Sequence, residues 1–299
     1  MESHPILRSL LTTTTTTTTT ATETTNTIIY EAKSVSPNDR FGILFRMLVI
    51  SFIGIISIWA NNEAAKGFSI NVVNDAGTSS LSGKRFRLFY ESNDEAVRIV
   101  LNTSTFVENI LYPNENSKHK KKTITSVTLR LAPTEIPSIV SVDSPKNNDY
   151  VISLSPLLFE SINNNRAVVL AVLQGMARVL LWDGNRATPP VLLDGMVEYI
   201  SSLAGFTRTE LIWNSRATVS SLEHNDVCWK AMDPRKVAAF LRYWDENKKP
   251  GAVRGDVIRR LNEAMRNEWR DSMMDDALGM AGHDACATYH MMIMKSSSM

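Results

Sequence analysis

The chain has 299 residues, of which 43% are hydrophobic and 21% are charged, and its formal net charge is +1. This composition is typical of a folded protein with room for one large domain, and it excludes a chain that is disordered throughout. The near-neutral charge argues against a dominant nucleic-acid surface. We interpret the dense basic run at 118–122 as a solvated loop, and we expect no nucleic-acid partner.

Residues 1–40 are polar and include an uninterrupted threonine run from Thr12 to Thr20. Such a tract has too little apolar surface to offset the entropy lost on ordering, so we predict a disordered threonine-rich leader. Its Ser/Thr content is a feature of plastid transit peptides, but acidic residues such as Glu23 and Glu31 are atypical of them.

Residues 41–60 form an apolar segment whose one charge is Arg46. Its length matches the hydrocarbon core of a bilayer, so we predict a transmembrane signal-anchor in a single-pass protein. Basic residues on its N-terminal side (Lys33, Arg40 and Arg46) outnumber Lys66 on the other side. This bias favours a cytosolic N-terminus and a lumenal or extracellular domain.

The alternative for this segment is a cleaved signal, since the charge-free stretch 47–60 has the length of a signal-peptide core and could be cut after Ala60. The protein would then be secreted. On either reading, the sequon at Asn102 becomes a glycosylation site. The two cysteines, Cys228 and Cys286, form one disulfide or remain as two buried thiols, and the sequence leaves this open.

The folded part is expected at 68–290, followed by a frayed tail at 291–299. Alternating polar and apolar residues predict strands at 85–90, 123–131 and 150–154. Helical periodicity, caps and breakers predict helices at 94–112, 166–182, 191–204, 234–247, 253–269 and 273–280. Strands followed by helices indicate an α+β architecture.

The helix at 166–182 is apolar on every side except at Gln174 and Arg178, which are four residues apart and share one face. A helix that is apolar all round is normally buried, so these two polar side chains point into surroundings that must satisfy them. In zinc hydrolases two histidines at this spacing hold the metal, and a glutamate beside the first acts as the base. Here the corresponding residues are Gln174, Gly175 and Arg178.

The next helix offers Asp194 and Glu198, again four residues apart on one face. A step of twenty residues from Arg178 to Glu198 is compatible with a helix–loop–helix that turns back on itself. In zinc hydrolases a carboxylate from a later helix supplies the third metal ligand. The carboxylate half of such a site is therefore present, while the imidazole half is replaced.

The stretch LLWDGNRATPPVLLDGMVEYISSLAGF, at 180–206, resembles the plant basic secretory protein family, zincin-like proteins regarded as metallopeptidases. Asp194 and Glu198 match the family's two carboxylates, and a weaker similarity extends over 84–288. The resemblance implies a zincin-like fold, in which a small mixed sheet packs on a central helix with a second site helix and additional C-terminal helices. It also implies zinc as the family's cofactor.

The chain departs from the family where the family has His, Glu and His. Gln174 is a weak neutral ligand, Gly175 has no carboxylate to act as a base, and the charge of Arg178 would repel a cation. We therefore predict that the zinc site is lost, with no catalytic residue and no cofactor. The resulting hypothesis is a membrane-anchored pseudo-metallopeptidase with a binding or defence-related role, whose partner is a peptide, a glycan or a protein.

Several alternatives remain at this stage. Arg178 could pair with Asp194 or Glu198 and take the place of the metal, or Arg178 and Gln174 could simply reach solvent. The competing functions are an active hydrolase of the secretory pathway with a non-standard site, and a structural anchor that binds no ligand.

Overall fold

The computed structural model describes residues 45–54, 67–113, 121–161, 164–207, 228–230, 233–247 and 254–297. The chain divides into two compact units, and the larger one holds everything from Phe68 to the C-terminus. The predicted leader at 1–40 lies outside the described residues.

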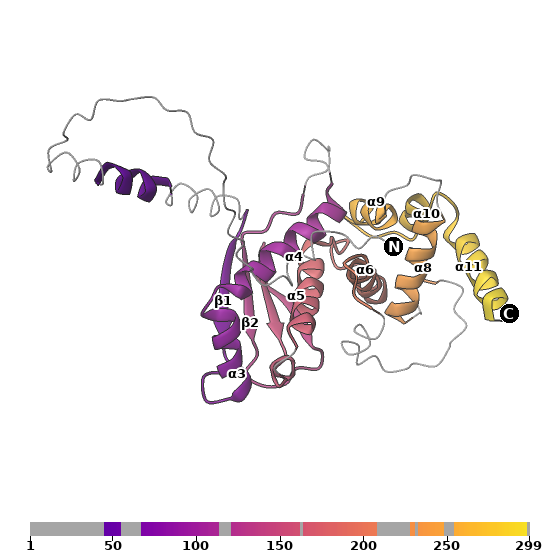
Figure 1. The fold of residues 1–299 in the computed structure, drawn as a ribbon. Coiled ribbons are helices and arrows are strands. Elements are labelled where there is room, and N and C mark those ends of the chain that lie inside the picture. Colours follow the sequence, from indigo (N-terminus) through magenta and orange to yellow (C-terminus); the bar gives the residue numbers. More distant parts are fainter. Residues whose placement is uncertain are drawn as a thin grey trace, which may run out of the picture. The chain divides into compact units, whose positions relative to one another are not determined.

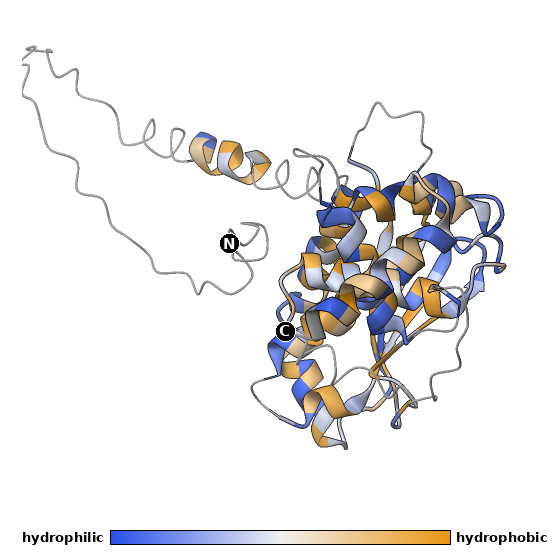
Figure 2. Ribbon diagram, turned by 90° about the vertical axis from the view of Figure 1, so that its right-hand side faces the viewer, coloured by the Kyte–Doolittle hydropathy of each residue, from blue (hydrophilic) through white to orange (hydrophobic). Residues whose placement is uncertain are grey.

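In the smaller unit, residues 45–54 form a helix whose side chains are exposed, Phe45 to 68% and Ile50 to 65%. Figure 2 shows its mostly apolar colouring. The rest of the apolar segment at 41–60 lies outside the described residues. Within the described ranges, no helix combines the length and the apolar character that a membrane crossing requires. The membrane anchor stays a prediction.

The larger unit contains a four-stranded mixed sheet with the strand order β1-β2-β4-β3. Its strands are β1 (Ser69–Asn74), β2 (Ser126–Leu131), β3 (Val140–Lys146) and β4 (Asp149–Leu154). The strands β1, β2 and β4 run parallel, and β3 pairs antiparallel with β4. The mixed sheet and its helices confirm the expected α+β class.

The two faces of this sheet differ in chemistry because side chains alternate along each strand. One face carries buried apolar residues such as Leu129 and Ile152, which face the helices. The other face carries polar side chains, where Arg130 donates hydrogen bonds to Ser153 at 3.2 and 2.9 Å. The core therefore lies on one side of the sheet, between it and the helices.

The predicted strand at 85–90 is wrong, because these residues are helical. Helix α3 (Leu81–Phe86) continues directly into the π-helical turn η1 (Arg87–Glu91). Ser80 caps the start of α3, where its hydroxyl accepts a hydrogen bond from the Gly83 N–H at 2.9 Å.

Packing explains why the apolar residues of this segment follow a helical rather than an alternating pattern. Phe86 and Tyr90, four residues apart, lie on one helical face with their ring centroids 6.0 Å apart. Each of these rings packs on Phe159 in a T-shaped arrangement, with ring centroids 5.3 Å apart. This aromatic cluster anchors the segment to the end of the sheet, since Phe159 follows β4 in the short 3-10 helix η2 (Pro156–Phe159).

The helices form two layers beyond the sheet, as Figure 1 shows. The first layer is α4 (Glu95–Leu111) and α5 (Asn165–Leu180), which contact each other and the strands. Behind it, α6 (Pro190–Leu203) packs on α5 and on α8 (Pro234–Glu246). The remaining helices are α9 (Asp256–Ala264), α10 (Ser272–Leu278) and α11 (Gly282–Ser297).

The predicted helices at 94–112, 166–182, 191–204, 234–247, 253–269 and 273–280 are confirmed, with α9 shorter than expected. Helix α11 runs through most of the segment expected as a frayed tail, and Met291 and Met294 there are exposed. The strands β1 and β3 were not predicted.

Candidate functional site

The residues at the positions of the zinc motif lie on α5, between the sheet and α6. Most side chains of α5 are buried, as its apolar sequence predicts. Gln174 is 5% exposed, whereas the side chain of Arg178, one turn later, is 33% exposed. The alternative in which both side chains reach solvent therefore fails for Gln174.

At Gly175, α5 approaches the sheet closely. A Cβ atom at this position would lie 2.6 Å from Cγ2 and 3.2 Å from Cδ1 of Ile152 on β4. Real Cβ atoms essentially never come this close to another carbon atom. A glutamate at position 175, as in the family pattern, would require Ile152 to move.

The second site helix, α6, is held by a similar contact on its other side. A Cβ atom at Gly195 would lie 2.5 Å from Cγ1 of Val237 on α8. This close approach packs α6 directly against α8, while its other side contacts α5. Glu198 is buried, with 8% of its surface exposed.

The two site helices are joined by a direct charge pair. The Nη2 of Arg178 donates a hydrogen bond to Oδ1 of Asp194 at 3.1 Å. Of the two carboxylates considered from the sequence, Asp194 accepts this hydrogen bond. Its side chain is 44% exposed, so we assign the pair less than about 1 kcal/mol. Gln174 and Glu198 also interact with other residues.

The residues at this site do not fit a zinc ion. The guanidinium of Arg178 lies at the position of the second imidazole. It also binds Asp194, which matches one of the two carboxylates of the family pattern. Ile152 fills the space that the side chain of a glutamate at position 175 would enter. Among the described residues, no group of three or more His, Cys, Asp or Glu side chains is arranged to hold a metal.

A buried carboxylate that the sequence analysis missed supports the site helices from behind. Asp245, near the end of α8, accepts hydrogen bonds from the Tyr199 hydroxyl at 2.7 Å and from the Gly255 and Val257 N–H groups at 2.5 and 3.0 Å. Burial, together with the Asp245 carboxylate, raises the pKa of Tyr199 above its ordinary value. Asp245 therefore links α6 and α8 and caps the start of α9.

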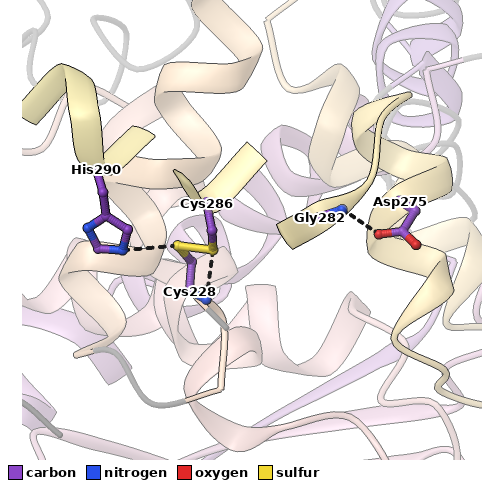
Figure 3. Close-up of a disulfide and its surroundings, with 5 residues drawn as sticks. All are labelled: Cys228, Asp275, Gly282, Cys286 and His290. Atoms are coloured by element: carbon purple, nitrogen blue, oxygen red, sulfur yellow. Dashed lines mark hydrogen bonds between the residues drawn. A yellow bond between two sulfur atoms is a disulfide. The ribbon is translucent and has the colours of Figure 1, made fainter. Parts of the chain in front are cut away.

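The two cysteines are joined, which resolves the alternative left open by the sequence. Cys228 and Cys286 form a disulfide, and the Cys228 N–H donates to Sγ of Cys286 at 2.8 Å (Figure 3). Nε2 of His290 lies 3.5 Å from Sγ of Cys228. The nearby start of α11 is capped by Asp275, which accepts a hydrogen bond from the Gly282 N–H at 2.6 Å.

The sequon residue Asn102 lies on the exposed side of α4. Its third residue, Ser104, is 4% exposed, and its hydroxyl donates to the Leu101 carbonyl at 2.8 Å. Glycosylation of Asn102 stays a prediction.

A pocket of about 240 Å³ lies at the other end of α5 from Arg178. It is lined by aromatic residues including Phe89 and Tyr90, and by polar residues including Arg85 and Asn165. Burial, and then the charge of Glu95, raises the pKa of Tyr90 to about 12. This pocket depends on the helical conformation of 85–90, which the alternating sequence pattern of that segment does not predict.

A protein-family model described as "Peptidase of plants and bacteria" matches residues 65–289 of the chain. No curated protein and no solved structure matches the chain.

Proposed function

Because the chain belongs to the basic secretory protein family, we propose that it is a member that has exchanged peptide hydrolysis for peptide binding. The match covers most of the larger unit, so the peptidase-like domain is the part of the chain to which the proposal applies. The membrane anchor at 41–60 belongs to the same proposal and rests on the apolar sequence of that segment.

The observation that carries the proposal is the pair formed by Arg178 and Asp194 at 3.1 Å. It puts a permanent positive charge at a metal-ligand position and uses a carboxylate that a metal would need. The contact between Gly175 and Ile152 adds to this support, because the base is absent and its space is filled. Three features that each oppose zinc-dependent hydrolysis therefore coincide at this site: the charge of Arg178, its pairing with Asp194 and the absence of a base at Gly175.

The edge strand β3 is the element best suited to hold a ligand. It pairs with β4 on one side, and no described strand pairs with its other side. The Ser155 N–H donates to the Ile139 carbonyl at 2.9 Å, so alternation along the antiparallel ladder directs the backbone groups of Val140 and Val142 to the open edge. An extended peptide can add there as a further strand.

The test of lost hydrolysis uses the purified full-length protein with carboxymethylated casein as an unfolded substrate. We expect well below one zinc ion per chain by elemental analysis after incubation with zinc and desalting, and no casein cleavage that a chelator abolishes. Stoichiometric zinc together with chelator-sensitive cleavage would show that the protein is a working metallopeptidase and would refute the proposal.

Binding is tested with the same casein, immobilised, and with proline variants of the two sheet edges. Val142→Pro removes an N–H that faces the open edge of β3, so we expect at least a ~10-fold loss of affinity. The matched control is Val72→Pro on the opposite edge strand β1, where the N–H also points away from the sheet. Equal binding by the wild type and Val142→Pro, or an equal loss in Val72→Pro, would exclude strand addition at β3.

A further inference from the structure

Three side chains of types that bind metals meet at the disulfide. Cys286 and His290 are four residues apart on α11 and share one helical face, and Cys228 reaches this face from a separate segment (Figure 3). Nε2 of His290 lies 3.5 Å from Sγ of Cys228. Thiolate sulfur and imidazole nitrogen are the usual ligands of zinc in structural sites.

The separation of these donor atoms fits a shared tetrahedral ion. Zinc binds sulfur at about 2.3 Å and imidazole nitrogen at about 2.0–2.1 Å, so a sulfur and a nitrogen on one tetrahedral zinc ion lie about 3.6 Å apart. The 3.5 Å between Sγ of Cys228 and Nε2 of His290 already matches this value. The Cα atoms of the two cysteines are 5.7 Å apart, a separation from which both side chains can reach one ion.

The surroundings of the three side chains also suit a metal ion. Cys228 and Cys286 are 1% and 3% exposed, whereas His290 is exposed and gives an ion a path from solvent. The Cys228 N–H donates to Sγ of Cys286 at 2.8 Å. Hydrogen bonds to a negatively charged acceptor are stronger than those to a neutral one, so this contact favours Cys286 as a thiolate ligand.

The intact disulfide excludes a metal, because its sulfur atoms are not thiolates and only a thiolate is a metal ligand. In this oxidised form, the described part of the chain holds no group of three or more His, Cys, Asp or Glu side chains that could bind a metal. We propose that Cys228, Cys286 and His290 bind a thiophilic divalent ion such as zinc once the disulfide is reduced. Water completes the tetrahedron, and the ion replaces the disulfide as the cross-link between Cys228 and α11.

The step that opens the site is thiol–disulfide exchange with a dithiol reductant. One thiolate of the dithiol attacks a sulfur atom of the disulfide, and its second thiolate then resolves the mixed disulfide. The dithiol loses two electrons and becomes a disulfide, while Cys228 and Cys286 gain them and become thiols. The ion then displaces one proton from each thiol, so the affinity for the metal rises with pH.

The experiment titrates cobalt(II) into the full-length protein, both oxidised and after reduction with a phosphine that is removed in the absence of oxygen. Cobalt(II), unlike the d¹⁰ zinc ion, gives a charge-transfer absorption band when thiolates bind it. We expect one cobalt ion per reduced chain with this band, and loss of the band when zinc is added. No band in the reduced protein, or the same band in the oxidised protein, would overturn the proposal.

The oxidised sample also separates this site from the residues on α5 and α6. A metal bound at the positions of the zinc motif would need no reductant, whereas the site at the disulfide opens only on reduction. Zinc bound by the reduced protein alone therefore leaves the proposed loss of hydrolysis untouched, and the two proposals can fail separately.

His290→Ala tests the third ligand. Even residues behind the ligands change metal affinity by about 10- to 100-fold, so we expect the reduced variant to bind cobalt at least ~10-fold more weakly. The matched control is His283→Ala on the same helix, where the imidazole is 75% exposed and lies 3.6 Å from Asp284. Wild-type affinity in His290→Ala, or the same loss in His283→Ala, would show that His290 is not a ligand.

Circular dichroism keeps the proposal testable where reduction unfolds part of the chain. In that case, zinc should restore the helical signal of the reduced wild type, because an ion that binds only the folded form stabilises it. The same addition should restore less signal in His290→Ala. A signal that zinc leaves unchanged in a partly unfolded wild type would count against the site.

Discussion

Gly175 shows how a single residue couples the chemistry of the site to its packing. Helix α5 can approach β4 closely only because this residue has no side chain, and Ile152 fills the space thus left. In a family whose pattern has a glutamate here, the loss of the base and the gain of a core contact are one change. A substitution that restores the glutamate alone would therefore disturb the core.

Gly175→Ala tests this coupling. Alanine favours a helix by about 1 kcal/mol relative to glycine. We nevertheless expect a net loss of about 1–3 kcal/mol in the free energy of unfolding, because an added Cβ overpacks the contact with Ile152. Urea unfolding of the full-length protein measures this change.

The control is Ile152→Val in both backgrounds. Removal of a methylene group costs the wild type about 1 kcal/mol. In Gly175→Ala the same substitution should cost less, because it removes Cδ1, which would lie 3.2 Å from the added Cβ, while Cγ2 at 2.6 Å is retained. A variant Gly175→Ala that is as stable as the wild type would show that α5 and β4 separate without cost.

At the scale of elements, Asp245 explains why three helices around the site keep their arrangement. A carboxylate that accepts three hydrogen bonds, two of them from the first turn of α9, ties that turn to α8 and to Tyr199 on α6. The N-terminal end of a helix favours a negative charge, so the placement satisfies both partners. α6, which carries Asp194, is thereby supported by residues distant in sequence.

The helices were largely predictable from the sequence because they are long, periodic and bounded by caps and breakers. The edge strands were not: β1 reads SINVVN and β3 reads VSVDSPK, short segments with polar residues and, in β3, a proline. Edge strands need only one partner and tolerate such residues. Their pairing with β2 and β4 is a property of the sheet, which local sequence does not record.

The candidate site was predictable only in part. Spacing placed Arg178 on one helical face and Asp194 and Glu198 on another, and the structure brings these helices together. The hydrogen bond between Arg178 and Asp194 and the contact of Gly175 with Ile152 depend on how α5 and α6 are rotated against their neighbours. That rotation is fixed by tertiary packing, so the local pattern could not supply it.

At the scale of the whole molecule, the disulfide closes a loop of 58 residues between Cys228 and Cys286. The loop contains α8, α9 and α10, which support the site helices from behind. We expect the double variant Cys228→Ser/Cys286→Ser to lose about 4 kcal/mol of stability, from the entropy that the cross-link removes from the unfolded chain.

Urea unfolding of the oxidised wild type, the reduced wild type and the double variant measures this loss. The reduced wild type should match the double variant, and a reductant should leave the double variant unchanged. Equal midpoints for the oxidised wild type and the double variant would contradict a stabilising role of the disulfide.

The position of Cys286 has a consequence for how the protein is made. Cys286 follows α8, α9 and α10 in the chain, so the ring around these helices can close only after all three have been synthesised. Until then, a nascent chain carries Cys228 as a thiol without its partner. A transcript that stops shortly before codon 286 would encode the whole of α5 and α6 and yet yield a protein in which Cys228 is left without its disulfide partner.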